Sequence, residues 1–474
     1  MFSLAEVVQA LTAIKIGGQD RIFSEAVVDS RQTIRGALFV AVPGEKTDGH
    51  QYISQAFQKG ALAALVQQDC PAEYRTVDLR EENAADIASV SFPAFPFCIR
   101  VDNTIEALQK IAAFHRDQLN IKVIGITGTV GKSTTKELVA EVLSKRYFTL
   151  KNTGNLNNEI GLPLTLLQAG KGHQIAVLEM GFYVSGEIEF LCKIAKPEIG
   201  LITNVGAVHA ERAGSMEAIA LGKSELVQAL PEDGYAVLNY DDPSVRPMAE
   251  KTKASVFYYG LDAKANMWAD QIESYGLEGI RFCLHYKKES YFLRIPLIGR
   301  HSVHTALRAA SVGKILGLDW GEIFTGLNHA QSQLRMAVIH SEKGALIIDD
   351  TYNASPESTM AALNLLSEMN GYKLAVLGEM LELGQYEYQG HTMVGARAAE
   401  ICDELVAVGS KSKYLAESAR RAGMPSGKIH WFQTVADTID FIAQRGLSKN
   451  EVVLVKGSRS LQMERIVEMM ETTL

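Results

Sequence analysis

Residues 121–135, IKVIGITGTVGKSTT, constrain the fold of this chain more than any other stretch. The apolar, β-branched run 123–126 is typical of a buried parallel strand. A turn with two glycines follows, and residues 136–145 then carry apolar side chains at helical spacing. A strand, a glycine turn and a helix in this order can cradle phosphate, because backbone N–H groups close around the anion and the helix start adds positive potential. The stretch therefore predicts a site for a nucleoside triphosphate.

Side chains at the predicted helix start would contact the phosphates. Lys132 can reach the terminal phosphates, and the hydroxyl of Ser133 or Thr134 can bind Mg²⁺. The other residues expected to surround ATP here are Thr127, Gly128, Thr129, Val130 and Gly131. The match to the general P-loop pattern is incomplete, because Ile126 stands where the pattern has its first glycine. A turn that only joins a strand to a helix is the alternative.

Length and composition are those of an ordinary multidomain globular protein. The 474 residues correspond to about three domains at ~100–200 residues each. The chain has 47 basic and 55 acidic residues, and its net charge of −8 argues against a general binder of nucleic acid or anionic membranes. No apolar run approaches ~20 residues and the N-terminus lacks the basic region of a signal peptide. We therefore expect no transmembrane segment and a cytoplasmic location.

The cysteines are odd in number and widely spaced. They stand at positions 70, 98, 192, 283 and 402, with no C-x-x-C pair among them. This spacing predicts reduced structural thiols rather than a disulfide framework or a zinc site.

We expect three α/β domains, at residues 1–118, 119–327 and 328–474. In the first, short strands at 26–30 and 36–42 are followed by polar turns that contain Ser30 and Arg31, then Thr47 and Asp48. Layered α/β proteins usually present ligand contacts where strands end. Plain turn chemistry is the alternative, because Asp, Ser and Gly favour turns.

Polar residues also follow the strands of the second domain, which we expect to be a P-loop-type parallel sheet. Glu179 ends the apolar run 175–181, and a Mg²⁺ ion beside the phosphates would satisfy a carboxylate placed there. A salt bridge to a neighbouring helix is the alternative. His209 follows the next strand and could be a second metal ligand or a structural histidine. Lys223 lies in a helical pattern where a lysine is usually a solvated surface residue.

An amide-rich segment, residues 152–158, precedes a short apolar helix in this domain. Its Asn157 and Asn158 could bind phosphate and sugar oxygens, because amides offer both donors and acceptors. They could also serve as caps and turns. Residues 257–298 alternate between apolar and polar, which predicts an antiparallel flap or sheet extension.

The third domain alternates apolar strands with helical patterns. Strands are expected at 345–350, 373–378, 404–409 and 452–457. This order predicts a small doubly wound, Rossmann-like α/β domain. Polar residues again follow a strand end, at Asp350, Tyr352 and Asn353, and Arg335 lies near the junction with the second domain.

With these motifs laid out, the chain resembles the Mur ligases, the ATP-dependent amide-forming enzymes of peptidoglycan precursor synthesis, over essentially its whole length. The shared motifs are TGTVGKST, Glu179, the 204–209 segment, Gly299-Arg300-His301, Arg335 and the turn at Asp350. Further strings, among them GNLNNEIGLP, DDTYNASPES and LGEMLELG, are similar to the branch that joins D-alanyl-D-alanine to a UDP-N-acetylmuramoyl-tripeptide. The implied reaction passes through an acyl phosphate, in an enzyme that we expect to be a monomer.

The resemblance implies a role for each candidate residue. The catalytic and metal-binding residues, which would hold the ATP phosphates and two Mg²⁺ ions, are Lys132, Ser133, Glu179, His209 and a carbamylated Lys223. Nucleotide contacts from beyond the P-loop would come from His301, Thr305, Arg335, Asp350, Tyr352 and Asn353. The UDP substrate would contact Ser30, Arg31, Thr47 and Asp48, with Asn157 and Asn158 nearer its phosphates or muramoyl group.

Two departures from the family pattern concern ATP. The family usually has Asn where Val130 stands, and it usually reads His-Asn-x-x-Asn where this chain has residues 301–305, HSVHT. The second Asn of that motif normally faces adenine, so we expect a weaker base contact here. The alternatives are another Mur-type ligase (a tripeptide synthetase or a folylpolyglutamate synthase) and a P-loop kinase or nucleotide switch, which would not need an amine.

Overall fold

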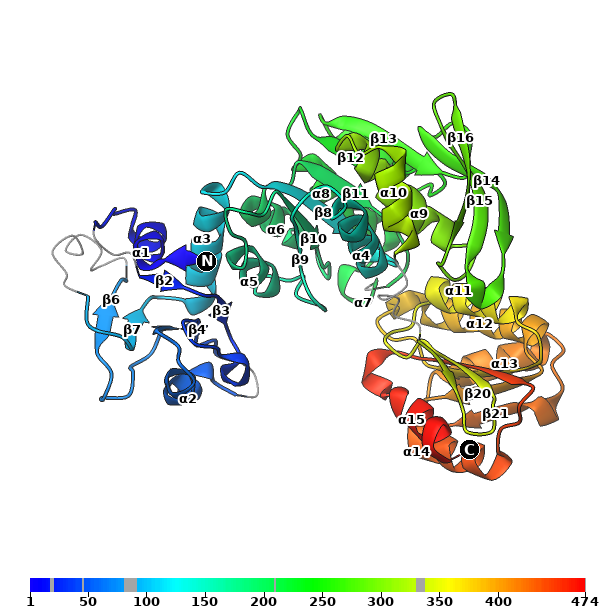
Figure 1. The fold of residues 1–474 in the computed structure, drawn as a ribbon. Coiled ribbons are helices and arrows are strands. Elements are labelled where there is room, and N and C mark those ends of the chain that lie inside the picture. Colours follow the sequence, from blue (N-terminus) through cyan, green and yellow to red (C-terminus); the bar gives the residue numbers. More distant parts are fainter. Residues whose placement is uncertain (18–20, 45–46, 81–91, 209, 330–336, 474) are drawn as a thin grey trace.

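Three α/β units follow one another along the chain (Figure 1). The computed structural model describes residues 1–17, 21–44, 47–80, 92–208, 210–329 and 337–473. Each unit is built on one main sheet flanked by helices, and these main sheets are largely parallel, which confirms the expected mixed α/β class. Among the described residues, no helix has the length and apolar character needed to cross a bilayer.

The first unit is built on a five-stranded parallel sheet in the order β3-β4-β5-β7-β6. Its strands are β3 (Ala26–Val27), β4 (Leu38–Val40), β5 (Ala63–Val66), β6 (Thr76–Asp78) and β7 (Phe97–Arg100), and its helices are α1 (Leu4–Thr12) and α2 (Ile53–Gln58). A two-stranded ribbon, β1 (Phe2–Ser3) with β2 (Ile22–Phe23), precedes the sheet. Helix α1 begins at a capping box, in which Ser3 and Glu6 satisfy each other's backbone N–H groups.

The structure corrects the expectation that all five cysteines are free thiols. Cys70 and Cys98 form a disulfide across 28 residues of sequence. Cys98 lies in β7 and Cys70 follows the neighbouring strand β5, so sheet pairing brings together two residues whose spacing gives no signal. Cys192, Cys283 and Cys402 are free and buried, as expected.

Helix α3 (Thr104–Asp117) joins the first unit to the second and packs on both. One continuous apolar core contains Leu108 and Ile111 of α3 together with Leu162 and Leu166 of the central unit. Polar contacts add to it, because the Gln109 side-chain amide donates to the Glu159 carbonyl at 3.0 Å. The first two units are therefore fixed to each other by a shared core.

The central unit contains a nine-stranded sheet in the order β16-β15-β14-β13-β12-β11-β8-β10-β9. Its parallel part consists of β8 (Lys122–Thr127), β9 (Thr149–Lys151), β10 (Ile175–Glu179), β11 (Ile199–Ile202), β12 (Tyr235–Asn239) and β13 (Ser255–Gly260). The helices around them are α4 (Lys132–Leu143), α5 (Gly161–Leu167), α6 (Glu187–Ala195), α7 (Ala210–Ala213), α8 (Met216–Gln228), α9 (Ser302–Ile315) and α10 (Trp320–Asn328). The predicted strand, turn and helix at residues 121–143 are thus present as β8 and α4.

The antiparallel extension is present but begins later than the sequence predicts. It consists of β14 (Met267–Ser274), β15 (Ile280–Tyr286) and β16 (Glu289–Ile295). Strand β13, which contains Phe257, instead pairs parallel with β12, so the expectation of antiparallel pairing from residue 257 is wrong. An alternating strand at the border of a sheet fits either direction of pairing, because alternation reports only that one face is covered.

The third unit is a six-stranded sheet in the order β17-β18-β22-β19-β20-β21. Its strands are β17 (Ala337–His340), β18 (Leu346–Asp349), β19 (Tyr372–Gly378), β20 (Glu404–Val408), β21 (Ile429–Phe432) and β22 (Glu451–Lys456). All pairs are parallel except the edge pair of β17 with β18. Its helices are α11 (Pro356–Glu368), α12 (Glu387–Ile401), α13 (Ser412–Arg421), α14 (Val435–Arg445) and α15 (Glu464–Thr473).

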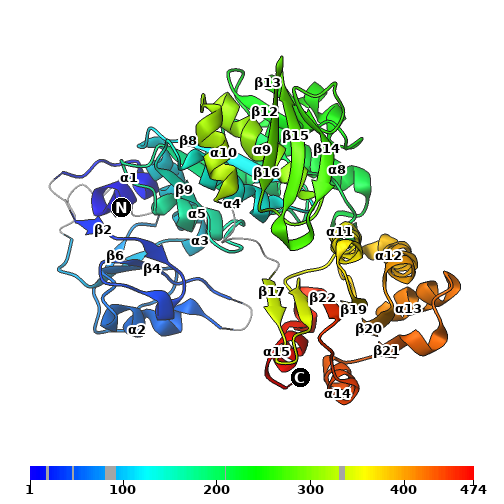
Figure 2. The same cartoon turned by 45° about the vertical axis from the view of Figure 1, so that its right-hand side comes forward.

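Several polar contacts join the central and third units. In both views the lower end of β14 and β15 reaches α11 (Figure 2), where the Ser274 hydroxyl donates to the carboxylate of Glu368. Beside α7, the Glu211 N–H donates to the Glu382 carbonyl at 3.4 Å. The Gln385 amide donates to the Gly214 carbonyl at 3.3 Å. Ala207 and Ile298 of the central unit are partly buried against the core of the third unit, but among the described residues no core cluster contains fully buried side chains of both units.

Candidate active site

The P-loop, residues 127–134, is tied to the loop that follows β11. The side-chain oxygen of Asn204 accepts from the N–H of Val130 at 2.8 Å, and the Asn204 carbonyl accepts from the N–H of Thr129 at 3.0 Å. Thr203 donates its hydroxyl to the Val130 carbonyl at 2.8 Å. Strands β8 and β11 are neighbours in the sheet, so their following loops meet at the same edge. The turn is therefore held in shape by the adjacent loop.

Two glycines are required in this turn. Gly128 and Gly131 have φ of +145° and +80°, a region that residues with a side chain rarely occupy. A Cβ on Gly128 would also lie 1.9 Å from the Thr203 hydroxyl oxygen. Gly131 directly precedes α4, which begins at Lys132. These features place the backbone N–H groups at the start of α4 as an anion-binding turn requires.

Ser133 and Glu179 meet at the carboxyl edge of the central sheet. The Ser133 hydroxyl lies 2.5 Å from one oxygen of Glu179, whose other oxygen accepts from the Asn157 amide at 2.9 Å. Both Ser133 and Glu179 are buried. Lys132 lies beside them and donates to the carbonyl oxygens of Gly128, at 2.8 Å, and Thr129, at 3.1 Å. A hydroxyl and a carboxylate next to a phosphate turn form the oxygen donor set that Mg²⁺ prefers.

Asn152 positions Glu179 and was not selected from sequence. Its side chain bonds both the N–H and the carbonyl of Glu179, at 2.9 and 3.0 Å, while its own carbonyl accepts from the buried Lys136 ammonium at 2.6 Å. Asn158, in contrast, caps α5 by accepting from the N–H of Gly161 at 2.9 Å. The structure thus places Asn157 at the candidate metal site and Asn158 in a turn.

Lys223 lies in α8 and its side chain is buried, so the interpretation as a solvated surface lysine is wrong. Burial, reinforced by the nearby charge of Lys132, holds the pKa of Lys223 well below its usual range. The Lys223 nitrogen lies 4.7 Å from the centre of the Phe182 ring, which follows β10. A lowered pKa increases the share of neutral amine, which is the form of lysine that reacts with carbon dioxide.

Arg308 of α9 connects that helix to the phosphate turn, and sequence patterns did not single it out. Its guanidinium donates to the Thr135 hydroxyl at 2.6 Å and to the Tyr259 hydroxyl at 3.0 Å. It also lies 3.2 Å from the point where Gly131 would carry a Cβ. Arg308 is buried, so its charge acts on the P-loop without much screening by solvent. A charged residue in the apolar repeat of 302–315 is the signal that could have revealed it.

The remaining nucleotide candidates are spread over two units. Thr134 is half-buried in α4, Thr305 is buried in α9, and His301 is exposed directly before α9. In the third unit, Asp350 forms an ion pair with the buried Lys456 at 2.7 Å, at the ends of the neighbouring strands β18 and β22. Exposed side chains follow Asp350 at Tyr352 and Asn353. His209 and Arg335 lie outside the described residues.

The N-terminal candidates gather at one edge of the first sheet. Strands β3 and β4 are neighbours, so the turns that follow them, with Ser30 and Arg31 and with Thr47 and Asp48, lie side by side. The guanidinium of Arg31 is exposed and binds Asp29 at 2.8 Å. Ser30 donates to Gln55 at 2.6 Å, and Asp48 holds His50 at 2.6 Å. The edge thus presents an exposed cation next to hydroxyl and carboxylate groups.

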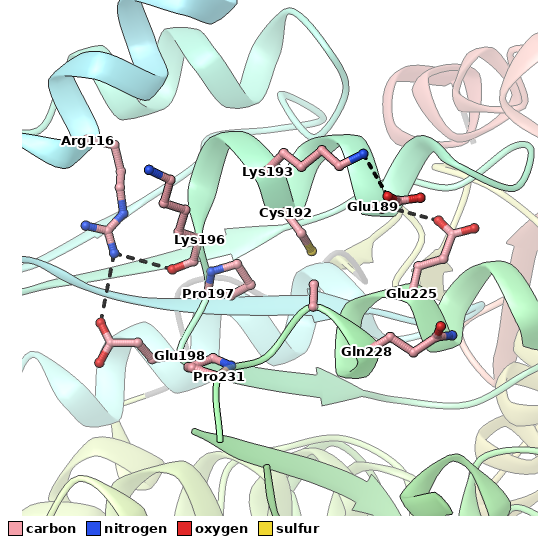
Figure 3. Close-up of a pocket in the computed structure, with 11 residues that line it drawn as sticks. Arg116, Glu189, Cys192, Lys193, Lys196, Pro197, Glu198, Glu225, Gln228 and Pro231 are labelled. Carbon is pink, nitrogen blue, oxygen red and sulfur yellow. Dashed lines mark hydrogen bonds and ion pairs between the residues drawn. The ribbon is translucent and has the colours of Figure 1, made fainter. Parts of the chain in front are cut away.

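A cavity of about 760 Å³ lies at the opposite ends of the central strands (Figure 3). It is lined by residues before β11 and β12 and by α6, α8 and Arg116 of α3. Some of its charged groups are paired with one another, as in the contacts of Arg116 with Glu198, at 3.9 Å, and Lys193 with Glu189, at 2.7 Å. Because it faces away from the P-loop, this cavity is separate from the candidate active site.

Comparisons with known proteins agree with this geometry. The chain matches the models "Mur ligase family, catalytic domain" over residues 26–116, "Mur ligase middle domain" over 126–313 and "Mur ligase, glutamate ligase domain" over 334–459. The chain belongs to the Mur ligase family.

Particular relatives share one activity. The UDP-N-acetylmuramoyl-tripeptide–D-alanyl-D-alanine ligase of Bacillus subtilis is 34% identical, over 98% of this chain and 97% of that protein. A crystal structure of MurF from Acinetobacter baumannii is similar with a TM-score of 0.83 and 31% identity, covering 99% and 98% of the two chains. A MurF ligase from Thermotoga maritima in complex with ADP has a TM-score of 0.79 and 27% identity, covering 96% and 99%.

Proposed function

We propose that this chain joins D-alanyl-D-alanine to UDP-N-acetylmuramoyl-tripeptide, using ATP and forming the UDP-linked pentapeptide, ADP and phosphate. The observation that carries the proposal is the meeting of Lys132, Ser133 and Glu179 at one sheet edge, in a chain that is collinear with ligases of this name. The expected domains correspond to the UDP-substrate site at 1–118, the ATP site at 119–327 and the closing Rossmann-like domain at 328–474.

The chemical task is to make a carboxylate react with an amine. In the proposed route the terminal carboxylate of the tripeptide attacks the γ-phosphate of ATP, and ADP leaves. The amine of the dipeptide then attacks the carbonyl carbon of the acyl phosphate, phosphate leaves, and the amine loses a proton. The protein mainly positions the groups and offsets their charge. Lys132 lies where it can exchange its carbonyl partners for the γ-phosphate.

Mg²⁺ is the proposed cofactor at Ser133, Glu179 and His209. When bound it would screen the repulsion between carboxylate and triphosphate, which is severe at ~4 Å in a dry site. Asn157 and Asn152 keep the Glu179 carboxylate and backbone fixed toward that position. If Lys223 carries a carbamate, its anionic oxygens would add to the donors of Ser133, Glu179 and His209, and this larger set could hold two Mg²⁺ ions.

A test of the ligase function measures phosphate release. We expect release to require both the UDP-tripeptide and D-alanyl-D-alanine, with formation of the pentapeptide nucleotide. A kinase or nucleotide switch would release phosphate with ATP alone, and a tripeptide synthetase would require a UDP-dipeptide and a single amino acid. Either pattern would contradict the proposal. Folylpolyglutamate synthase shares the fold at 18% identity, and a folate substrate tests that alternative.

The proposed carbamate at Lys223 has its own test. Lys223→Ala is expected to be nearly inactive and to be partly restored by added acetate or formate, because a small carboxylate can replace the lost anion. Lys251→Ala, at a surface lysine, is the control. Carbon-13 NMR of wild-type protein in labelled bicarbonate should show a carbamate signal that the variant lacks. Normal activity of Lys223→Ala, or an equal signal in both proteins, would rule out the carbamate.

The proposed setting is that of a monomeric cytoplasmic enzyme whose partners are its two peptide substrates, with no nucleic acid. The net charge of −8 supports the last point.

A further inference from the structure

The antiparallel extension of the central sheet carries a cluster of metal-binding side chains that the ligase reaction does not use. Asp270 on β14 lies opposite Cys283 on β15 in the sheet register. His285 follows Cys283 by two residues and so projects from the same face. Donor atoms of the three side chains all lie within 4.8 Å of one another.

The imidazole of His285 is held in one orientation. One ring nitrogen, Nε2, lies 2.9 Å from a carboxylate oxygen of Asp270, and the other, Nδ1, lies 2.8 Å from the Ser290 hydroxyl on β16. The ring also stacks on Trp268, with centroids 3.8 Å apart and planes 16° apart. A hydroxyl behind one nitrogen, with the other nitrogen aimed at an anionic ligand, is the arrangement that orients metal-binding histidines.

Cys283 completes a mixed donor set. Its side chain is 2% exposed, while Asp270 and His285 are half-buried, so the cluster is shallow rather than enclosed. The residue opposite Cys283 on β16 is Phe292, and Trp268 stands opposite His285. Aromatic groups therefore flank the three donors on the same face of the sheet, which limits the access of water to them.

We propose that Asp270, Cys283 and His285 bind a divalent transition-metal ion of the zinc class. Sulfur, imidazole nitrogen and carboxylate oxygen are all common Zn²⁺ ligands, and three protein ligands leave a fourth tetrahedral position for water. A thiolate disfavours Mg²⁺ and Ca²⁺, so this site differs in kind from the site at Ser133 and Glu179, which has no thiol among its proposed ligands. On binding, the Cys283 thiol releases its proton to solvent, and Nε2 of His285 becomes a ligand while Nδ1 donates its hydrogen to Ser290.

The sequence spacing predicted no such site. The 12 residues between Asp270 and Cys283 match no common metal motif, and only the pairing of β14 with β15 brings the two together. The position also has a structural consequence. The register of β14 shifts between Asp270 and Glu273, so a metal at Asp270 would fasten β14 to β15 next to this β-bulge.

Cobalt titration of the full-length protein, first stripped with a chelator, tests the site. Co²⁺ bound by a thiolate gives a sulfur-to-metal charge-transfer band in the near ultraviolet, which the ATP site cannot produce because none of its proposed ligands is a thiol. We expect one equivalent of Co²⁺ to give this band, quench Trp268 fluorescence and be displaced by Zn²⁺ but not by excess Mg²⁺.

Matched variants assign the ligands. Cys283→Ser should abolish the band, whereas Cys402→Ser, at a buried thiol of the third unit, should keep it. Ser290→Ala should weaken Co²⁺ binding by roughly 10–100-fold, because it removes the group that orients His285. ATP-dependent ligation by Cys283→Ser confirms that this variant is folded. Absence of the band in the wild-type protein, or its persistence in Cys283→Ser, would overturn the proposal, and neither result bears on the ligase activity.

Discussion

At the scale of single residues, the candidate active site is a set of polar groups that satisfy one another until ligands replace the contacts. Lys132 donates to two carbonyl oxygens of its own turn, and Ser133 donates to Glu179. Each of these contacts can be exchanged for a phosphate oxygen or a metal ion without moving the backbone. The groups behind them, Asn152 and Arg308, are fixed by bonds to neighbouring elements and keep the arrangement preorganised.

Lys132→Ala is the direct test of the P-loop. We expect kcat to fall on the order of 10²-fold or more, because the charge that stabilises the transferred phosphoryl group is lost. Steady-state phosphate release measures the effect, and Lys145→Ala, at an ion-paired surface lysine, should change little. Near-normal turnover of Lys132→Ala would contradict the assignment.

A second prediction at this scale concerns Gly222, next to Lys223. A Cβ on Gly222 would lie 2.0 Å from the ring of Phe182, the ring over which the Lys223 nitrogen lies. Gly222→Ala should therefore destabilise the protein by about 1–3 kcal/mol through overpacking and should reduce activity by displacing Lys223.

Denaturant titrations of four proteins measure this effect. Phe182→Ala should itself destabilise, but Gly222→Ala should cost almost nothing in the Phe182→Ala background, because the clash is gone. An equal cost of Gly222→Ala in both backgrounds would show that the ring is not the cause.

Some residues of the candidate active site can be identified from the sequence and others cannot, and the difference has physical reasons. Glu179 could be found because a carboxylate at the end of an apolar strand is costly unless something binds it. Arg308 is harder to find, because only its charge within an apolar repeat marks it, and its partners Thr135 and Tyr259 are 173 and 49 residues away. Likewise, Asn158 and Asn157 look alike in sequence, yet one caps a helix and the other contacts Glu179.

At the scale of elements, the third sheet is tied together at the amino ends of its strands. Arg445, at the end of α14, bonds Glu404 at the start of β20, at 2.8 Å, and Glu451 at the start of β22, at 2.7 Å. Both carboxylates are buried. Although burial alone would raise the pKa of Glu404, the bonds from Arg445 and Tyr372 bring it below its usual value.

Arg445→Met is expected to destabilise the protein by about 3 kcal/mol near neutral pH, because two buried carboxylates lose their partner. A depressed carboxyl pKa stabilises the fold above the unfolded-state value of ~4.3, and this contribution is lost as pH falls through the folded-state value. The difference between wild type and variant should therefore shrink on acidification. Urea unfolding at several pH values measures it, with the exposed Arg421→Met as control, and a difference independent of pH would contradict the argument.

The positions of strands can be predicted from the sequence where a strand is buried on both faces, because its residues then form an uninterrupted apolar run. Strands β8, β10, β19, β20 and β22 lie where such runs predict them, because parallel strands covered by helices carry little polarity. Which strands pair with each other cannot be predicted in this way, because the partner of a strand depends on the arrangement of the whole sheet. The direction of β13 and the disulfide between Cys70 and Cys98 both depend on pairing, and both differ from expectation.

At the scale of the whole molecule, the two junctions differ in kind. The first and second units share a fully buried apolar core through α3, whereas the described contacts of the second with the third are polar bonds and a few partly buried apolar side chains. Candidate nucleotide contacts are divided across the second junction, with Lys132 on one side and Asp350 on the other. Polar interfaces between domains commonly permit relative motion. We therefore expect the third unit to close on the central one when substrates bind, while the first stays fixed.

Small-angle scattering tests this closure. The radius of gyration should decrease when a non-hydrolysable ATP analogue and the UDP-tripeptide are both present, because ligands bridge the two sides. Disulfide trapping can identify the moving unit, through cysteine pairs placed across each junction. No compaction, or trapping that reports motion between the first two units, would contradict the expectation.

The shared core around α3 also bears on which peptide the enzyme accepts. A rigid link keeps the edge of the first sheet, where Ser30 and Arg31 lie, at a constant span from the turn that contains Lys132. If the uridine end of the substrate binds at that edge, as proposed, only a peptide of the matching length brings its terminal carboxylate to the phosphate. In this arrangement the rigid junction formed by α3 would select substrates by the length of their peptide.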